Sequence, residues 1–247
     1  TDFTSRSPAF TSFVELVGQR LAKEDLATFK GDLTPFNETV DGKEVSLETM
    51  RQDIMSSTKE NVVVRRWFEQ SVFGDNRRVF SYVHSNNKLG VLVAIEGPNK
   101  EAVESPEFIE FGNNVAMQIA AMGPICVSVD QIPEAEVKRQ RAIFETQLKE
   151  EGKPEAKWEN IMFGKMNKWH TTVALNEMES VITPKITVGA LAKKLEAKVL
   201  SFSRCVLGEG LEIVQEDYAN EIAKMTGLEV ETAEVEDVRS ETISTLN

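Results

Sequence analysis

Residues 78–96 read Arg78-Val-Phe-Ser-Tyr-Val-His-Ser-Asn-Asn-Lys-Leu-Gly-Val-Leu-Val-Ala-Ile-Glu96, and this stretch decides the fold class. In its second half apolar side chains fall on alternate positions, which places them on one face of a strand. The polar residues Ser85-Asn86-Asn87 interrupt the pattern and form a short turn. The stretch therefore predicts two antiparallel strands, 78–84 and 89–96, joined as a β-hairpin with one apolar face.

A helix that can cover this apolar face follows in the sequence. Ser105 and Pro106 are typical of an N-cap with proline at the first helical position, and Gly123-Pro124 is typical of a helix end. We expect this helix over 106–122. A short strand is expected over 125–129, and a strand over 198–207 is expected to join the hairpin's sheet. The apolar stripe of the helix consists of Phe108, Phe111, Val115, Ile119 and Met122.

The N-terminal part of the chain repeats the serine–proline helix signature at Ser7 and Pro8. The segment that follows this helix contains two glycines and a proline, which favour a loop. The expected elements are a helix over 8–23, a loop over 25–44, a second helix capped by Ser46 and a strand over 61–68.

Two highly charged helices, 134–151 and 155–169, are expected next, because only Gly152-Lys153-Pro154 separates them. So tight a joint predicts an antiparallel helical hairpin. Packing between the helices explains its apolar residues better than a cofactor pocket does. The expected seam sets Val137, Phe144 and Leu148 against Trp158, Met162, Met166 and Trp169.

Beyond Pro184 we expect a helix over 188–195 and a last helix that carries Tyr218, Ile222 and Met225. Strands and helices mix without regular alternation, which predicts an α+β fold rather than a parallel sheet. The fold class expected is two subdomains with small antiparallel sheets covered by helices, plus the helical hairpin as an insertion. The expected domains are residues 1–73, residues 74–133 with 171–227, the insertion 134–170 and an acidic tail 228–247.

The composition of the 247-residue chain excludes several classes of function. It is 41% hydrophobic and 28% charged, which is typical of a globular protein, and no apolar run approaches the ~20 residues that cross a bilayer. Its net charge of −12 argues against direct nucleic-acid binding, which needs clustered Lys and Arg. Cys126 and Cys205 are far apart, so we expect neither a zinc site nor a disulfide, and a reducing compartment.

Sequence signatures of nucleophilic and metal-dependent catalysis are absent, and no cofactor or metal is expected. His170 ends a helix, where a structural role is favoured. His84 lies beside the polar hairpin turn, where a side chain can point to a partner, but a role in supporting the turn is an equal alternative. A hydrolase that uses His84 and nearby acids is a further alternative, disfavoured by the lack of a nucleophile motif.

The first residues, Thr1-Asp2-Phe3-Thr4, place an acid and a large aromatic ring before the first helix. Burying such a ring is worth about 1.5–3 kcal/mol, while the neighbouring carboxylate resists burial unless it is paired. Two interpretations follow: Phe3 covers the protein's own core, or Phe3 is a wedge that inserts into another protein.

Several segments, taken in order, resemble one protein family: Thr1-Asp2-Phe3 with Arg6 and Phe10, residues 61–66 (Asn-Val-Val-Val-Arg-Arg), Tyr82-Val83-His84 with residues 89–93, residues 115–121, Gly152-Lys153-Pro154 with Gly164-Lys165-Met166, Thr187-Val188-Gly189, and residues 208–212. The family is translation elongation factor Ts of bacteria and organelles, the guanine-nucleotide exchange factor of elongation factor Tu. Each motif is short, but their shared order makes chance a poor explanation.

The resemblance implies elongation factor Tu as the partner and an exchange factor rather than an enzyme. It implies that Thr1, Asp2, Phe3 and Thr4 wedge against the G domain of Tu near its magnesium site, that His84 contacts the same domain, and that the region 199–212 holds another domain. A Tu-binding or scaffold protein without exchange activity is the alternative. Homodimerisation through the helical hairpin is a further expectation, as is a bacterial cytoplasmic location, with the mitochondrial matrix or chloroplast stroma as alternatives.

Two departures from the family pattern accompany the resemblance. The family places a helical domain and a strand pair before the first motif, so we expect the sequence to be part of a longer protein and the strand over 61–68 to lack neighbours. Thr4 stands where the family has valine, which adds a hydroxyl to the wedge.

Overall fold

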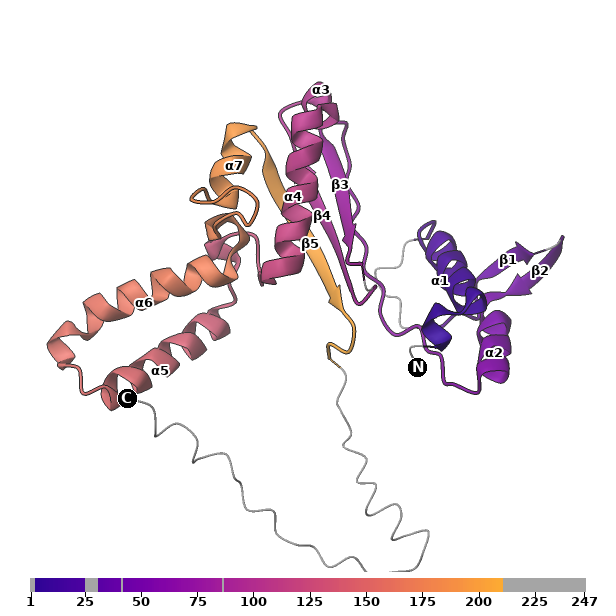
Figure 1. The fold of residues 1–247 in the computed structure, drawn as a ribbon, viewed down its shortest axis with the longest axis horizontal. Helices are drawn as coiled ribbons and strands as arrows, with labels where there is room; N and C mark the ends of the chain where they lie inside the picture. The colour runs from indigo at the N-terminus through magenta and orange to yellow at the C-terminus, as the bar shows by residue number, and fades with distance from the viewer. Residues whose placement is uncertain (1–2, 25–30, 41, 86, 211–247) are drawn as a thin grey trace, which may run out of the picture. The chain divides into compact units, whose positions relative to one another are not determined.

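The computed structural model describes residues 3–24, 31–40, 42–85 and 87–210 (Figure 1). The chain divides into two units, Thr1–Leu207 and Gly208–Asn247, and the account below concerns the first. Its architecture is α+β, with two small antiparallel sheets, helices and a helical hairpin, as the sequence predicted.

The larger sheet is formed by β3 (Arg77–Val83), β4 (Leu89–Glu96) and β5 (Lys198–Val206) in the order β3-β4-β5 (Figure 1). All neighbours are antiparallel, and Phe80, Val93 and Phe202 stand opposite one another across the three strands. The predicted β-hairpin and the predicted addition of the C-terminal strand are both confirmed.

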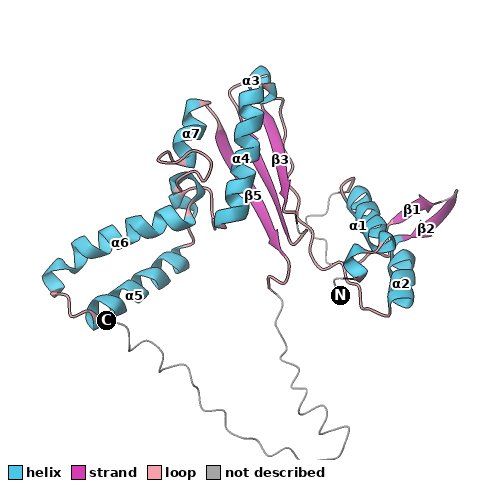
Figure 2. Cartoon of the chain, viewed as in Figure 1, coloured by secondary structure: helices cyan, strands magenta, loops and turns pink. Residues whose placement is uncertain are grey.

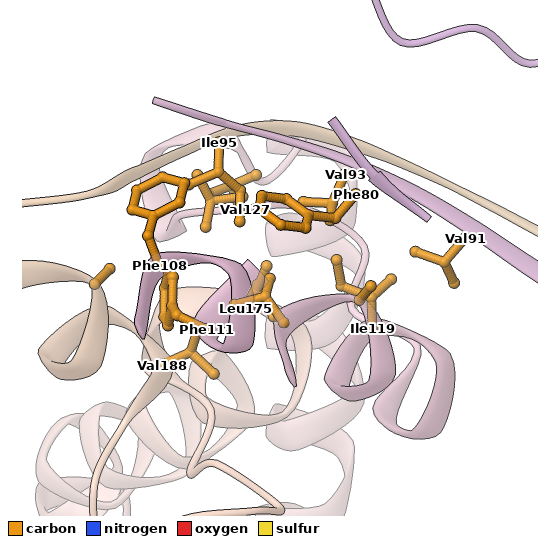
Figure 3. Close-up of a cluster of buried hydrophobic side chains, with 14 of the residues drawn as sticks. Phe80, Val91, Val93, Ile95, Phe108, Phe111, Ile119, Val127, Leu175 and Val188 are labelled. Atoms are coloured by element: carbon orange, nitrogen blue, oxygen red, sulfur yellow. The ribbon is translucent and has the colours of Figure 1, made fainter. Parts of the chain in front are cut away.

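One face of this sheet is covered by α4 (Pro106–Met122), as predicted from its apolar stripe. The Ser105 hydroxyl accepts a hydrogen bond from the Phe108 N–H at 3.3 Å, and Gly123 ends the helix with a positive φ of 59°. Figure 3 shows Phe80 of the sheet and Phe108 of α4 in the same layer of buried side chains. The short helices α3 (Lys100–Glu104) and α7 (Val188–Lys194) contribute Val103 and Val188 to this core.

Gly112 marks the closest approach of α4 to β3. A Cβ atom at this position would lie 2.3 Å from carbons of the Phe80 ring, which no packed structure tolerates. We expect Gly112→Ala to lower the free energy of unfolding by about 1–3 kcal/mol, as overpacking does, despite the better helix propensity of alanine. Amide hydrogen exchange, read separately in α4 and in the helix that contains Gly164, measures the change, because the structure has several separate cores.

Gly164→Ala is the matched control, since Gly164 also lies inside a helix but has no heavy atom within 4 Å of the place that a Cβ would occupy. This substitution should raise the free energy of unfolding by up to about 1 kcal/mol. Equal stability of the two variants would contradict the close packing of α4 on β3.

The N-terminal part contains a 3₁₀ turn η1 (Thr4–Arg6), α1 (Pro8–Leu21) and α2 (Leu47–Thr58). Both predicted helices are confirmed, with Ser7 and Ser46 as N-caps. They share a core of their own, separate from that of the larger sheet. Its buried members are Phe13, Val17, Leu21, Leu33, Leu47 and Ile54.

The expected loop over 25–44 was wrong in part. Within it begins a two-stranded sheet, β1 (Asn37–Val40) paired with β2 (Lys43–Ser46). The pairing is that of a tight hairpin, because Val40 stands opposite Lys43. Its exposed, polar strands carry little of the apolar alternation by which strands are recognised.

Two predicted strands are absent from the described residues. Residues 61–70 form no strand, although Val62, Val64 and Trp67 pack against the N-terminal core, because no described strand pairs with them. Residues 125–129 contain only one parallel bridge, between Cys126 and Ala174. Apolar patterning was present in both segments, but a partner strand was not.

The helical hairpin is confirmed as α5 (Glu134–Glu150) and α6 (Trp158–Val173), which Figure 2 shows side by side. Leu148, Met162 and Met166 are buried between the helices, with Val137, Phe144, Trp158 and Trp169 packed around them, as predicted.

The two ends of the helical hairpin are joined to each other at its root. The Ile125 N–H donates to the Val173 carbonyl at 2.9 Å, and the Leu175 N–H donates to the Cys126 carbonyl at 3.0 Å. Short 3₁₀ turns, η2 (Val129–Gln131) and η4 (Leu175–Glu177), stand on either side. The predicted last helix with Tyr218, Ile222 and Met225 lies outside the described residues, and the domain boundaries stay a prediction.

Candidate functional site

Phe3 presents its ring to solvent. The side chain is 87% exposed, although it belongs to the first described turn of the chain. Its carbonyl accepts a hydrogen bond from the Arg6 N–H at 3.2 Å, which closes the turn η1. The ring therefore does not cover the N-terminal core. Thr1 and Asp2, the other two residues expected at this site with Thr4, lie outside the described residues.

Thr4, the next residue, is in contrast only 6% exposed. Its hydroxyl donates to Oε1 of Glu60 at 2.7 Å, and its carbonyl accepts from the Ser7 hydroxyl at 2.8 Å. Of the residues expected to form the wedge, Phe3 is therefore exposed, whereas Thr4 is buried and hydrogen-bonded.

The segment around Glu60 is hydrogen-bonded to residues of α2. The Glu60 N–H donates to the Thr58 hydroxyl at 3.3 Å, and Nη1 of Arg51 donates to the Val62 carbonyl at 2.6 Å. Arg51 also binds Glu48, and this hydrogen bond lowers the pKa of the Glu48 carboxyl. The backbone is therefore bonded to α2 at Glu60 itself and again two residues later.

His84 follows the last residue of β3 and is exposed. Its N–H donates to the Leu89 carbonyl at 2.9 Å and its carbonyl accepts from the Asn87 N–H at 2.8 Å, which extends the hairpin pairing. The Tyr82 hydroxyl and Nδ1 of His84 are 2.9 Å apart. If the hydroxyl donates this bond, Nε2 carries the ring proton and is the nitrogen available to a partner.

Phe3 and His84 lie beside different secondary-structure elements. Phe3 adjoins the N-terminal helices, and His84 adjoins the larger sheet. No described hydrogen bond or ring contact joins the two residues. Each of the two residues is therefore a candidate contact described by itself.

A shallow apolar groove of about 220 Å³ lies on the side of the sheet opposite α4. Sequence reasoning missed the part that residues 68–70 play here. Phe68 lines the groove, and the Gln70 amide bonds the hydroxyls of Ser201 and Ser203 at 2.6 and 2.9 Å. No signal of spacing or residue type links this segment to β5.

The described residues around His84 and the two cysteines are the candidates for catalysis or metal binding. Tyr82 is the hydrogen-bond partner of the His84 ring there, and no group of acidic, histidine or cysteine side chains is arranged to hold a metal ion among those residues. Burial raises the pKa of the Cys126 thiol, and Asp130 acts in the same direction, so the unreactive thiol form is favoured. None of the described helices is sufficiently long and apolar for a bilayer span.

The chain with this α+β core, helical hairpin and exposed aromatic residue at its first described turn matches a known protein family over most of its length. The family model described as Elongation factor TS matches residues 1–209. The chain belongs to this family, and its function is accordingly that of a translation elongation factor Ts in protein biosynthesis.

Similar proteins named Elongation factor Ts come from several organisms. The chain is 35% identical to that of Teredinibacter turnerae over 223 residues, which is 90% of this chain and 69% of the relative. It is 35% identical to that of Brucella anthropi over 235 residues, covering 90% and 73%. For Halorhodospira halophila the identity is 32% over 222 residues, covering 90% and 70%.

Proposed function

We propose that this chain binds elongation factor Tu in its GDP form and promotes GDP release by disturbing the magnesium and phosphate site of Tu, so that GTP can bind. The observation that supports this proposal is the 87% exposure of the Phe3 ring beside the 6% exposure of Thr4. A large aromatic side chain outside the core, on a turn anchored by its neighbour, is suited to filling a pocket on a partner.

The physical basis lies in the demands of the magnesium ion. Mg²⁺ requires nearly ideal octahedral geometry, so a small displacement of its ligands weakens binding of the ion and of the phosphates it bridges. A ring inserted between helices of Tu would supply such a displacement. No bond is made or broken in this step, which is why the proposal is an exchange factor rather than an enzyme.

Two further contacts are part of the proposal. His84, held by Tyr82, contacts the G domain, and the region from Val199 into the residues beyond β5 binds another domain of Tu. The relatives named above come from bacteria, which favours the bacterial cytoplasm over an organelle. The homodimer expected through the helical hairpin has no support among the described residues.

The proposed function is tested with the 247-residue chain and Tu loaded with fluorescent GDP. Addition of the chain should speed GDP release, measured by stopped-flow fluorescence. Linkage requires reciprocity: GDP must weaken the binding of this chain to Tu by the same factor by which the chain weakens GDP binding. Complex formation without faster release would instead support a binding or scaffold protein, and the absence of a complex would refute both.

His84→Ala should reduce the acceleration of GDP release about two- to tenfold. This factor corresponds to the loss of one or two net hydrogen bonds at an interface. His170→Ala is the control, because His170 lies on α6 of the helical hairpin, where its ring makes a tilted contact with that of Trp169. An unchanged rate and unchanged affinity of His84→Ala for Tu would leave His84 with a structural role in the hairpin turn.

A further inference from the structure

We infer that Glu60 is a positioning residue for the Phe3 ring, acting through the buried hydroxyl of Thr4. The inference rests on the proposed function of Phe3 and extends it to a residue whose bond to Thr4 spans 56 positions of the sequence. Glu60 does not itself need to touch the partner. It fixes the direction in which the turn η1 presents the ring.

The hydrogen bond between Thr4 and Glu60 joins two segments that are otherwise distant in the chain. At 2.7 Å between Oγ1 and Oε1, it has the short distance typical of an O–H donor on a carboxylate. Thr4 is 6% exposed, so its hydroxyl would lose water on burial and needs such a partner. This bond ties the turn to the end of α2.

Glu60 is itself held in place. Lys59 ends α2 in the left-handed conformation with a φ of 58°, and the next N–H, of Glu60, bonds the Thr58 hydroxyl. Two residues further, the Val62 carbonyl accepts from Arg51. The acceptor for Thr4 is therefore supplied by a fixed segment rather than by a free surface side chain.

Phe3 lies next to Thr4 in the chain and has no burial of its own to restrain it. The orientation of its backbone is set by η1, through the bonds from Arg6 N–H to the Phe3 carbonyl and from Ser7 to the Thr4 carbonyl. Fixing Thr4 reduces the number of directions that the ring samples before binding. A contact residue that is already oriented loses less conformational entropy when the complex forms.

The expected signature is a change in apparent affinity at a constant maximum rate. When only a fraction of molecules presents the ring correctly, the apparent dissociation constant rises by the inverse of that fraction, while the bound complex is unaltered. If Glu60 only stabilised the fold, its loss would not raise the apparent dissociation constant while leaving the maximum rate unchanged.

The test uses four substitutions in the full chain. Glu60→Ala and Thr4→Val remove the bond, whereas Glu60→Gln and Thr4→Ser keep an acceptor and a donor. Glu15→Ala is the matched control, since Glu15 is an exposed carboxylate on α1. The first readout is amide hydrogen exchange of Arg6 and Ser7 in the free protein, and the second is GDP release from Tu as a function of the concentration of this chain.

We expect Glu60→Ala and Thr4→Val each to speed hydrogen exchange at both amides about tenfold and to raise the half-saturating concentration about tenfold, with the maximum rate unchanged. Glu60→Gln and Thr4→Ser should restore both quantities to within about twofold. The double variant Thr4→Val with Glu60→Ala should be no worse than either single variant, because both remove the same bond.

Other outcomes overturn the inference and distinguish it from the proposed function. Unchanged hydrogen exchange in Glu60→Ala means that the bond does not hold the turn. Faster hydrogen exchange with an unchanged half-saturating concentration means that the orientation of the turn does not matter for exchange. If Phe3→Ala itself leaves GDP release unaffected, the wedge has failed, and the hydrogen-exchange readout still decides whether Glu60 holds η1.

Discussion

Replacing Phe3 with alanine should slow the GDP release stimulated by this chain about thirtyfold or more. Truncation of a central aromatic contact typically costs about 2 kcal/mol or more, and about 1.4 kcal/mol corresponds to a factor of ten. The ring is 87% exposed, so its removal leaves no cavity in the protein. The change should therefore appear in the kinetics with Tu and not in the stability of the free chain.

Phe73→Ala provides a closely matched control for this experiment. Phe73 is also highly exposed, at 82%, and lies outside the described hydrophobic cores. Its substitution removes the same apolar area from the surface, so any general effect of lowering surface hydrophobicity appears in both variants. Equal rates for wild type and Phe3→Ala would refute the wedge, and equal losses in both variants would show that the effect is not specific to Phe3.

Phe108→Ala should destabilise the larger sheet and its covering helix by about 3–5 kcal/mol, the range for a fully buried phenylalanine. The side chain is 1% exposed, and its ring centroid lies 6.1 Å from that of Phe80 and 6.4 Å from that of Phe111. Its loss removes the contacts with both of these rings, and the ring also lies close to Gly97, where an added Cβ would be 3.0 Å from it.

The measurement must report on this core alone, since the structure has several separate cores. Hydrogen exchange of amides in β4 and α4 does so, whereas the three tryptophans belong to the N-terminal core and the helical hairpin. Phe163→Ala is the control, because this ring is 70% exposed on α6 and should change stability by less than about 0.5 kcal/mol. Protection in Phe108→Ala equal to that of the control would contradict the described packing.

Local signals predicted the helices well. The hydroxyls of Ser7 and Ser105 accept bonds from the N–H groups three residues later, so the whole interaction lies within a few residues of sequence. The proline that follows each serine restricts the same turn further. The seam of the helical hairpin was predictable for a similar reason, since a three-residue joint leaves the two helices little choice of partner.

Strand predictions failed where the partner was not determined by neighbouring residues. Val62 and Val64 alternate as in a strand, yet their burial comes from the N-terminal helices and not from a sheet. The hairpin of β1 and β2 was not predicted, although Asp41-Gly42 is a strong hairpin signal, because a glycine also favours an irregular loop. Gly42 has a φ of 76°, which such turns require.

The candidate site was predictable only in its residue types. Phe3 and His84 stood out from the sequence and from the family resemblance, and their role at an interface stays a prediction. Glu60 could not be found, because nothing in the sequence marks it as the acceptor for a hydroxyl 56 residues earlier. Hydrogen bonds between distant segments depend on the completed fold.

The helical hairpin rests on a single root, where the chain enters at Ile125–Cys126 and leaves at Val173–Leu175 through mutual backbone bonds. Because α5 begins and α6 ends beside this one junction, matched shortening or lengthening of the two helices would move the distal turn while the junction stayed as it is. The reach of this arm is therefore a variable that evolution can adjust without disturbing the sheet.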